Sequence, residues 1–164
     1  MKALFIGGIK SGKSRLAEVY ILEQSKQKPY YFATTEFFDD EMRERIVAHQ
    51  LRREDRFITL EEPIQLLNSL KDCTGFVLIE CVTMWLNNML YHKISEEKIL
   101  MELTAVLQLQ IDMVFVQNEV GLGVIPDNPL ARQFVDLSGK AAQLLAESCD
   151  EVFFCCAGLK TRLK

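Results

Sequence analysis

The stretch that most constrains this chain is residues 7–14, Gly-Gly-Ile-Lys-Ser-Gly-Lys-Ser, which matches the phosphate-loop pattern G-x-x-x-x-G-K-[ST]. An apolar run typical of a buried strand precedes it, and apolar residues at helical spacing follow it. A strand, a glycine-rich turn and a helix N-terminus form a cradle for phosphate, because inward backbone N–H groups and the helix dipole favour anions. The pattern predicts a nucleoside triphosphate site; the alternative is a chance match in a glycine- and serine-rich loop.

The residues of the phosphate loop are expected to have different roles. The Lys13 ammonium would reach the outer phosphates, and the Ser14 hydroxyl would hold Mg²⁺. We therefore treat Lys13 as a candidate catalytic residue and Ser14 as a candidate metal ligand. Contacts with the triphosphate are expected along the whole loop, from Gly7, Gly8, Ile9, Lys10, Ser11, Gly12, Lys13 and Ser14.

Short apolar runs alternate with helical patterns along the chain, which predicts an α/β fold with a mainly parallel sheet flanked by helices. The length of 164 residues suits a single domain over residues 1–164. Ligands in such folds bind outside the carboxyl ends of the strands. Strands are expected at 2–6, 29–33, 76–80, 113–117 and 151–156, with a weaker candidate at 57–60. Helices are expected at 13–26, 39–54, 63–70, 83–92, 96–109 and 129–147.

Composition narrows the classes of function. The net charge of −4 argues against nucleic acid as a main partner. No uncharged apolar stretch reaches 18 residues, so no membrane span is expected. A cleaved signal peptide is not expected either, since cleavage would remove the phosphate loop. The five cysteines include no C-x-x-C pair, which is typical of reduced thiols in a cytoplasmic protein.

Polar residues at the ends of the expected strands are further candidates. Glu80 ends the strand at 76–80, a position that holds Mg²⁺ directly or through water in phosphate-loop proteins. The alternative is a strand-end carboxylate or a helix cap. Thr34 and Thr35 follow the strand at 29–33, where their hydroxyls would either contact a phosphate or sugar or cap the next helix. The glycine- and proline-containing loop at 117–126 either binds a ligand, covers one or forms a rigid turn.

His49 lies late in the expected helix 39–54, within four residues of Arg45, Arg52 and Arg53. Neighbouring arginines keep an imidazole neutral more readily, and a neutral imidazole can attack phosphorus while arginines stabilise the negative charge there. The alternative is a surface helix with a solvated basic face. From the residues alone both interpretations stand.

Taken together, these residues resemble the bifunctional adenosylcobinamide kinase / adenosylcobinamide-phosphate guanylyltransferase family of cobalamin biosynthesis. The similarity runs nearly from end to end and includes several motifs beyond the phosphate loop. The matching segments are residues 7–15, 17–18, 32–35, 40–42, 45–46, 49, 61–63, 80–88, 118–123, 126–132 and 157–164.

The resemblance implies two reactions. One phosphorylates the aminopropanol hydroxyl of adenosylcobinamide with ATP or GTP, and the other transfers GMP from GTP to adenosylcobinamide phosphate through a GMP-histidine intermediate. His49 matches the guanylylated histidine, which makes it the second candidate catalytic residue beside Lys13. The resemblance also implies a RecA-like P-loop fold and a homotrimer. The implied nucleotide contacts, besides the phosphate loop, are Ala33, Thr34, Thr35, Gln50, Leu51, Arg52, Arg53, Glu61 and Glu80.

Three positions depart from the family pattern. Gln117 stands where a small hydroxyl residue is common, and Lys140 and Ala142 stand where arginine and asparagine are usual. Lysine lacks the fork of arginine, so a bidentate phosphate contact at residue 140 would be lost. These departures leave open a GTP-binding member without turnover. The other alternative, in which His49 is structural, is a small-molecule kinase of the P-loop class without guanylyl transfer.

Overall fold

One mixed sheet organises the chain in a computed structural model that describes residues 1–36 and 55–164. Its strand order is β3-β2-β4-β5-β1-β6-β7. All pairs are parallel except β6 with β7, which is antiparallel. This confirms the predicted α/β class. The strands are β1 (Lys2–Gly7), β2 (Tyr30–Ala33), β3 (Ile58–Glu61), β4 (Val77–Glu80), β5 (Met113–Asn118), β6 (Glu151–Cys156) and β7 (Leu159–Arg162).

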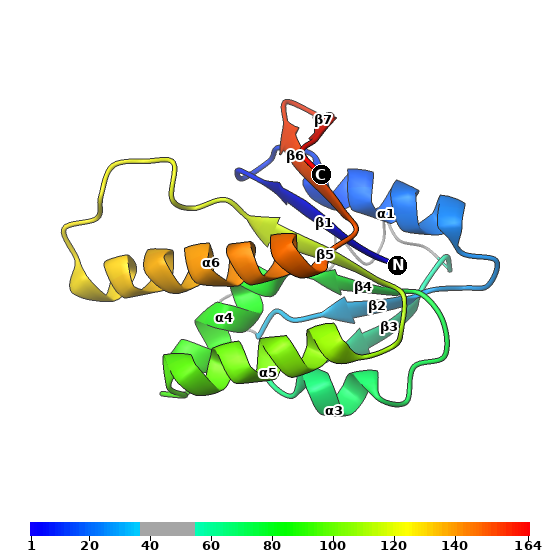
Figure 1. Cartoon of the computed structure of the whole chain (residues 1–164), viewed down its shortest axis with the longest axis horizontal. Helices are drawn as coiled ribbons and strands as arrows, with labels where there is room; N and C mark the ends of the chain where they lie inside the picture. Colours follow the sequence, from blue (N-terminus) through cyan, green and yellow to red (C-terminus); the bar gives the residue numbers. More distant parts are fainter. Residues whose placement is uncertain (37–54) are drawn as a thin grey trace.

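Helices cover both faces of this sheet (Figure 1). Helix α1 (Lys13–Gln24) packs on one face, against a cluster that contains Phe5 and Phe153. The other face carries α3 (Leu66–Leu70), α4 (Val82–Tyr91), α5 (Glu96–Gln108) and α6 (Pro129–Ser148). Within β1, Phe5 packs on the α1 side and Leu4 on the other side, because successive strand residues point to opposite faces. A strand buried on both sides has a continuous run of apolar residues, as at residues 3–6.

Three of the described helices, α4, α5 and α6, begin at a residue whose side chain caps the helix. Asn128 accepts hydrogen bonds from the backbone N–H groups of Leu130 and Ala131 at 2.8 and 3.2 Å, with Pro129 in the first turn. The Ser95 hydroxyl accepts from Lys98 N–H at 3.5 Å at the start of α5. The predicted helix at 39–54 lies outside the described residues.

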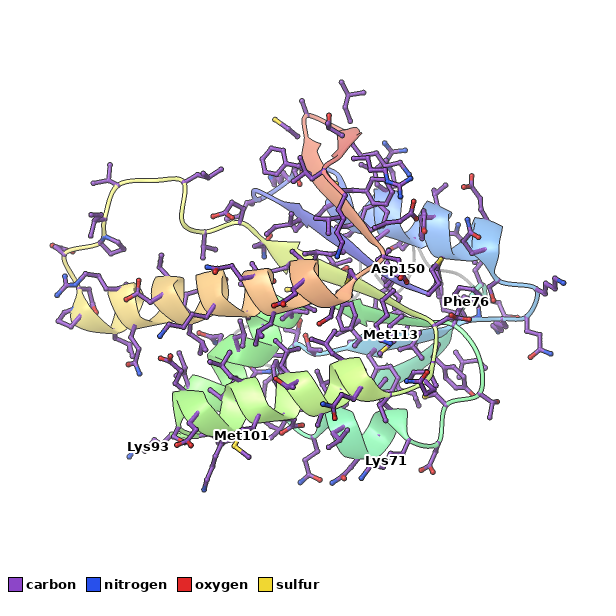
Figure 2. The ribbon with its side chains drawn as sticks, viewed as in Figure 1. Lys71, Phe76, Lys93, Met101, Met113 and Asp150 are labelled. Atoms are coloured by element: carbon purple, nitrogen blue, oxygen red, sulfur yellow. The ribbon has the colours of Figure 1, made fainter. Side chains whose placement is uncertain are left out.

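Two local predictions differ from the structure. The helix expected from residue 63 begins only at Leu66, because the Glu62 carboxylate accepts the N–H groups of Ile64 and Gln65, at 2.9 and 2.7 Å, in a turn. Strand β7 was not expected, since its four residues are all exposed and form no apolar run. Figure 2 shows Phe76, Met113 and Asp150 at the end of the sheet where β4, β5 and β6 begin, opposite the phosphate loop.

The Glu62 turn predicts how stability depends on pH. Burial opposes ionisation of this carboxyl, but the two N–H groups and the Ser69 hydroxyl, at 2.8 Å, outweigh burial and lower the pKa below its ordinary value of 4.5. The unfolded chain therefore binds the proton first as pH falls, so the stabilisation is complete above about pH 4.5 and is lost below it. In urea titrations, E62Q should show a shallower loss of unfolding free energy between pH 5 and pH 3 (roughly the window of carboxyl titration) than wild type or E23Q, an exposed control. Parallel profiles for E62Q and wild type would contradict this.

Candidate nucleotide site

The phosphate loop joins β1 to α1 and is closed by its own backbone. Ser11 N–H donates to Gly8 O at 3.2 Å, and Gly12 at φ +91° forms the cap of α1. That left-handed conformation favours glycine. Lys13 opens the helix with only 7% of its surface exposed, and its Nζ donates to Gly8 O at 3.1 Å. The structure therefore holds the Lys13 ammonium inside the curl of the loop, where the pattern places phosphates.

Ser14 and Glu80, the two predicted metal ligands, are in direct contact. Ser14 Oγ donates to Glu80 Oε1 at 2.6 Å, although the residues are 66 positions apart in the chain. A hydroxyl and a carboxylate are oxygen donors of the kind that Mg²⁺ takes together with substrate phosphates. Over residues 1–36 and 55–164 no three His, Cys, Asp or Glu side chains gather as a metal site. The Ser14–Glu80 pair supplies two oxygen donors, which fits an ion shared with a triphosphate.

Strand register brings the other candidates to the same edge of the sheet. Ala33 on β2 pairs with Glu61 on β3 and with Glu80 on β4. Gly7 on β1 pairs with Asn118 on β5. These residues each end a parallel strand, so the carboxyl edge collects the candidates that sequence position suggested.

Thr34 takes a supporting place at this edge. Its buried Oγ1 donates to Cys81 O and accepts from Cys81 N–H, both at 2.8 Å. Both hydrogen-bonding roles of the hydroxyl are thus used on the backbone that starts α4. Contacts of Thr34 and Thr35 with a nucleotide stay predictions.

Cys81 is a cap and not a nucleophile. Its Sγ accepts the N–H of Met84 at 3.4 Å at the start of α4. Burial first, and then the charge of Glu80, raise the pKa of this thiol to about 11. The thiol is therefore protonated at neutral pH and does not supply a thiolate beside the loop.

Two residues that hold the carboxyl ends of β2 and β3 in place had no role assigned from the sequence. Asn88 Nδ2 donates to Thr34 O at 2.6 Å and to Pro63 O at 3.1 Å. Trp85 Nε1 donates to Ile64 O at 2.8 Å. Both lie on α4 three residues apart, so one helix face ties down the ends of β2 and β3. In the sequence, the two residues stand out only by their positions after Glu80. Their acceptors are backbone carbonyl oxygens, which a sequence pattern does not identify.

The residues that depart from the family pattern pack against helices. Gln117 is buried, and its Nε2 donates to Ser138 O at 2.8 Å and to Ser138 Oγ at 3.1 Å on α6. Lys140 on α6 pairs with Glu96 on α5 at 2.5 Å, and Ala142 packs against the core cluster. Gln117 and Ala142 therefore have packing roles, whereas Lys140 forms an exposed ion pair between α6 and α5.

The loop after β5 is fixed at its far end and apolar at its tip. Arg132 Nη1 donates to the carbonyls of Pro126 and Asp127 at 2.8 and 2.7 Å. The side chains of Leu122, Val124 and Ile125 are 78%, 95% and 81% exposed. The structure thus supports a held turn with an exposed apolar tip, and a role toward a ligand stays a prediction.

Some predicted site residues cannot be placed. His49, Gln50, Leu51, Arg52 and Arg53 lie outside the described residues, so their roles remain expectations.

Over the described ranges, none of the helices combines the length and apolar character needed to cross a bilayer.

Solved structures share this fold at low sequence identity. A KaiC-like protein from Pyrococcus horikoshii OT3 matches with a TM-score of 0.52 and 14% identity over 93% of this chain and 69% of its own. A solved ATPase domain matches with a TM-score of 0.50 and 13% identity over 93% of this chain and 68% of its own. These likenesses support the predicted RecA-like P-loop NTPase fold.

Sequence relatives are much closer. The chain is 39% identical over 172 residues to the bifunctional adenosylcobalamin biosynthesis protein CobP of Pseudomonas aeruginosa, covering 100% of this chain and 98% of the relative. It is 32% identical over 183 residues to CobU of Escherichia coli K12, covering both chains completely. The family model described as cobinamide kinase / cobinamide phosphate guanyltransferase matches residues 3–163. The chain therefore belongs to the cobinamide kinase / cobinamide phosphate guanyltransferase family and is a transferase of cobalamin biosynthesis.

Proposed function

We propose that this enzyme phosphorylates adenosylcobinamide with ATP or GTP and then transfers GMP from GTP to adenosylcobinamide phosphate, with His49 as the covalent carrier. The observation that carries the proposal is the contact of Ser14 with Glu80 beside the enclosed Lys13 ammonium. The Lys13 ammonium and the oxygen atoms of Ser14 and Glu80 support a triphosphate site at this loop, in a chain that matches the two-activity family over residues 3–163. Family membership supports both reactions, and the geometry supports one loop serving both.

In the kinase step the substrate hydroxyl attacks the γ-phosphorus. The bond from the γ-phosphorus to the β–γ bridging oxygen breaks, the nucleoside diphosphate leaves, and the hydroxyl proton passes to solvent or a nearby base. The loop N–H groups and Lys13 bind the charge that grows on the bridging oxygen. Because these groups are fixed by the backbone of the loop, they need little rearrangement during transfer.

In the guanylyl-transfer step an imidazole nitrogen of His49 attacks the α-phosphorus of GTP. The bond from the α-phosphorus to the α–β bridging oxygen breaks and pyrophosphate leaves. A phosphate oxygen of adenosylcobinamide phosphate then attacks the same phosphorus, the P–N bond breaks and His49 is restored. Lys13 and the loop stabilise the departing pyrophosphate, so the same cradle acts on a different phosphorus.

Ser14 and Glu80 would hold Mg²⁺ in this site. When bound, the ion supplies positive charge to the phosphate oxygens. The 2.6 Å contact between Ser14 Oγ and Glu80 Oε1 brings both ligands to one position beside the loop. Phosphate oxygens and water would supply the other ligands of the ion, so these two protein ligands would be sufficient.

The experiment follows two labels into adenosylcobinamide. With Mg²⁺ and γ-labelled GTP or ATP, label should appear in adenosylcobinamide phosphate; with α-labelled GTP, label should appear in adenosyl-GDP-cobinamide with release of pyrophosphate. Replacing Mg²⁺ with excess EDTA should abolish both. Transfer of only the γ-label would establish the small-molecule kinase alternative, and GTP binding without either product would establish the non-catalytic one.

Two further proposals concern the cellular compartment and the oligomeric state of the enzyme. We place the enzyme in the cytoplasm, where nucleoside triphosphates are made and where its five free thiols would stay reduced. We also propose a homotrimer, on the family resemblance. Light scattering coupled to size-exclusion chromatography would test the trimer, and a monomer at the concentration used in assays would contradict it.

A further inference from the structure

The turn between β6 and β7 touches the phosphate loop from the far end of the chain. Figure 1 shows this hairpin, in red, beside the blue loop that joins β1 to α1. Gly158 N–H donates to Ser11 O at 2.8 Å. A Cβ built on Gly12 would lie 2.9 Å from Gly158 Cα, so the two backbones are in contact. The loop near the start of the chain is therefore braced by a turn near its other end.

The brace depends on the shape of the turn. Ala157 and Gly158 form the two-residue connection between Cys156 and Leu159, with φ of +52° and +80°. Positive φ at both positions is typical of tight hairpin turns, which match the twist of the strands. This conformation aims the Gly158 N–H at Ser11. A Cβ on Gly158 would have no atom within 4 Å, so an alanine there would act through backbone conformation and not through a clash.

The hairpin is itself anchored. Lys160 on β7 places Nζ 4.8, 5.3 and 5.4 Å from the ring centroids of Phe153, Tyr20 and Phe5. Such cation–π contacts favour a fixed position of β7 beside β6 at the edge of the sheet. On the loop side, Ser11 is only 7% exposed, so the acceptor of this hydrogen bond belongs to a buried residue. Both ends of the contact are thus fixed.

We propose that Gly158 is a positioning residue for triphosphate binding: its N–H holds the Ser11 carbonyl so that the loop N–H groups stay turned toward the phosphates. A preformed loop binds without the cost of ordering itself. A residue that disfavours positive φ would open the turn in the free protein, and the nucleotide would then have to re-form it on binding. The proposal rests on a triphosphate occupying the phosphate loop, as in the proposed function.

The test measures the dissociation constant of N-methylanthraniloyl-GTP by fluorescence in the presence of Mg²⁺. G158A should bind about fivefold to tenfold more weakly than wild type, and G158V more weakly still, because a left-handed conformation is unfavourable for alanine and worse for a β-branched residue. G158N should bind within about twofold of wild type, because asparagine tolerates this conformation. Binding that weakens from asparagine to alanine to valine would follow how well each residue adopts positive φ at position 158. A general loss of packing would not give this order.

The matched control is G75A. Gly75 also has positive φ, +140°, and no atom within 4 Å of a built Cβ, but it precedes β4 at the opposite end of the sheet. G75A should lose thermal stability and keep the wild-type dissociation constant. If G158V is folded by circular dichroism and binds as tightly as wild type, the proposal is wrong; if G158V does not fold, equal binding by G158A and wild type overturns it. If wild type itself fails to bind, the proposed function fails instead.

Discussion

Replacing Lys13 with methionine should lower kcat/KM by about 10³-fold for both kinase and guanylyl transfer, on the scale of losing one fixed charge at a phosphoryl or acyl transition state. Methionine approximates the length of the side chain and removes its charge. The effect is large because Lys13 is 7% exposed and is held by Gly8 O inside the loop, where its charge is poorly screened by water. The measurement is steady-state kinetics with each labelled nucleotide.

The controls for Lys13 separate charge in the loop from charge in general. K98A removes the same charge from the exposed side of α5 and should leave both activities unchanged. K13R should also lose most activity, because a planar guanidinium does not fit a space shaped for a compact ammonium. Retention of more than about a tenth of either activity by folded K13M would mean that Lys13 does not stabilise the transferred charge.

The central strands of the sheet could be predicted closely because they are apolar on both faces. Residues 2–6, 113–117 and 151–156 each agree with β1, β5 and β6 to within one residue. Strand β7 escaped prediction because pairing with β6, and not its own apolar residues, makes it a strand. The start of α3 was misplaced because a side chain, the Glu62 carboxylate, takes N–H groups that a helical pattern assigns to a helix.

The site could be predicted where strand ends decide it. Glu80 was chosen as a candidate from its place at the end of an apolar run, and the structure shows it in contact with Ser14. Asn88 and Gly158 could not be found in this way. Both act on backbone carbonyls of distant segments, Asn88 on Thr34 and Gly158 on Ser11. Every residue has a backbone carbonyl, so the residue type does not reveal which carbonyl accepts a hydrogen bond. Such contacts are visible only in the folded chain.

Replacing His49 with alanine should abolish labelling of the protein by α-labelled GTP and lower guanylyl transfer by at least about 10³-fold, as removal of a covalent nucleophile does in other enzymes. Kinase activity should stay within a few-fold of wild type, since γ-phosphoryl transfer needs the loop and not the imidazole. The wild-type adduct should be labile to acid and stable to base, as expected of a P–N bond to histidine. Peptide mapping should place it on residue 49.

The sequence offers a matched control for His49, because it contains one other histidine. His92 follows α4 and pairs with Glu36, with Nε2 at 2.9 Å from Oε2. H92A removes an imidazole at an exposed hydrogen bond with Glu36 and should still form the adduct at the wild-type level. Full labelling of H49A, or an adduct mapped to another residue, would overturn the carrier role. Loss of both activities in folded H49A would instead place His49 in triphosphate binding, because only a role confined to the α-phosphorus leaves the kinase step intact.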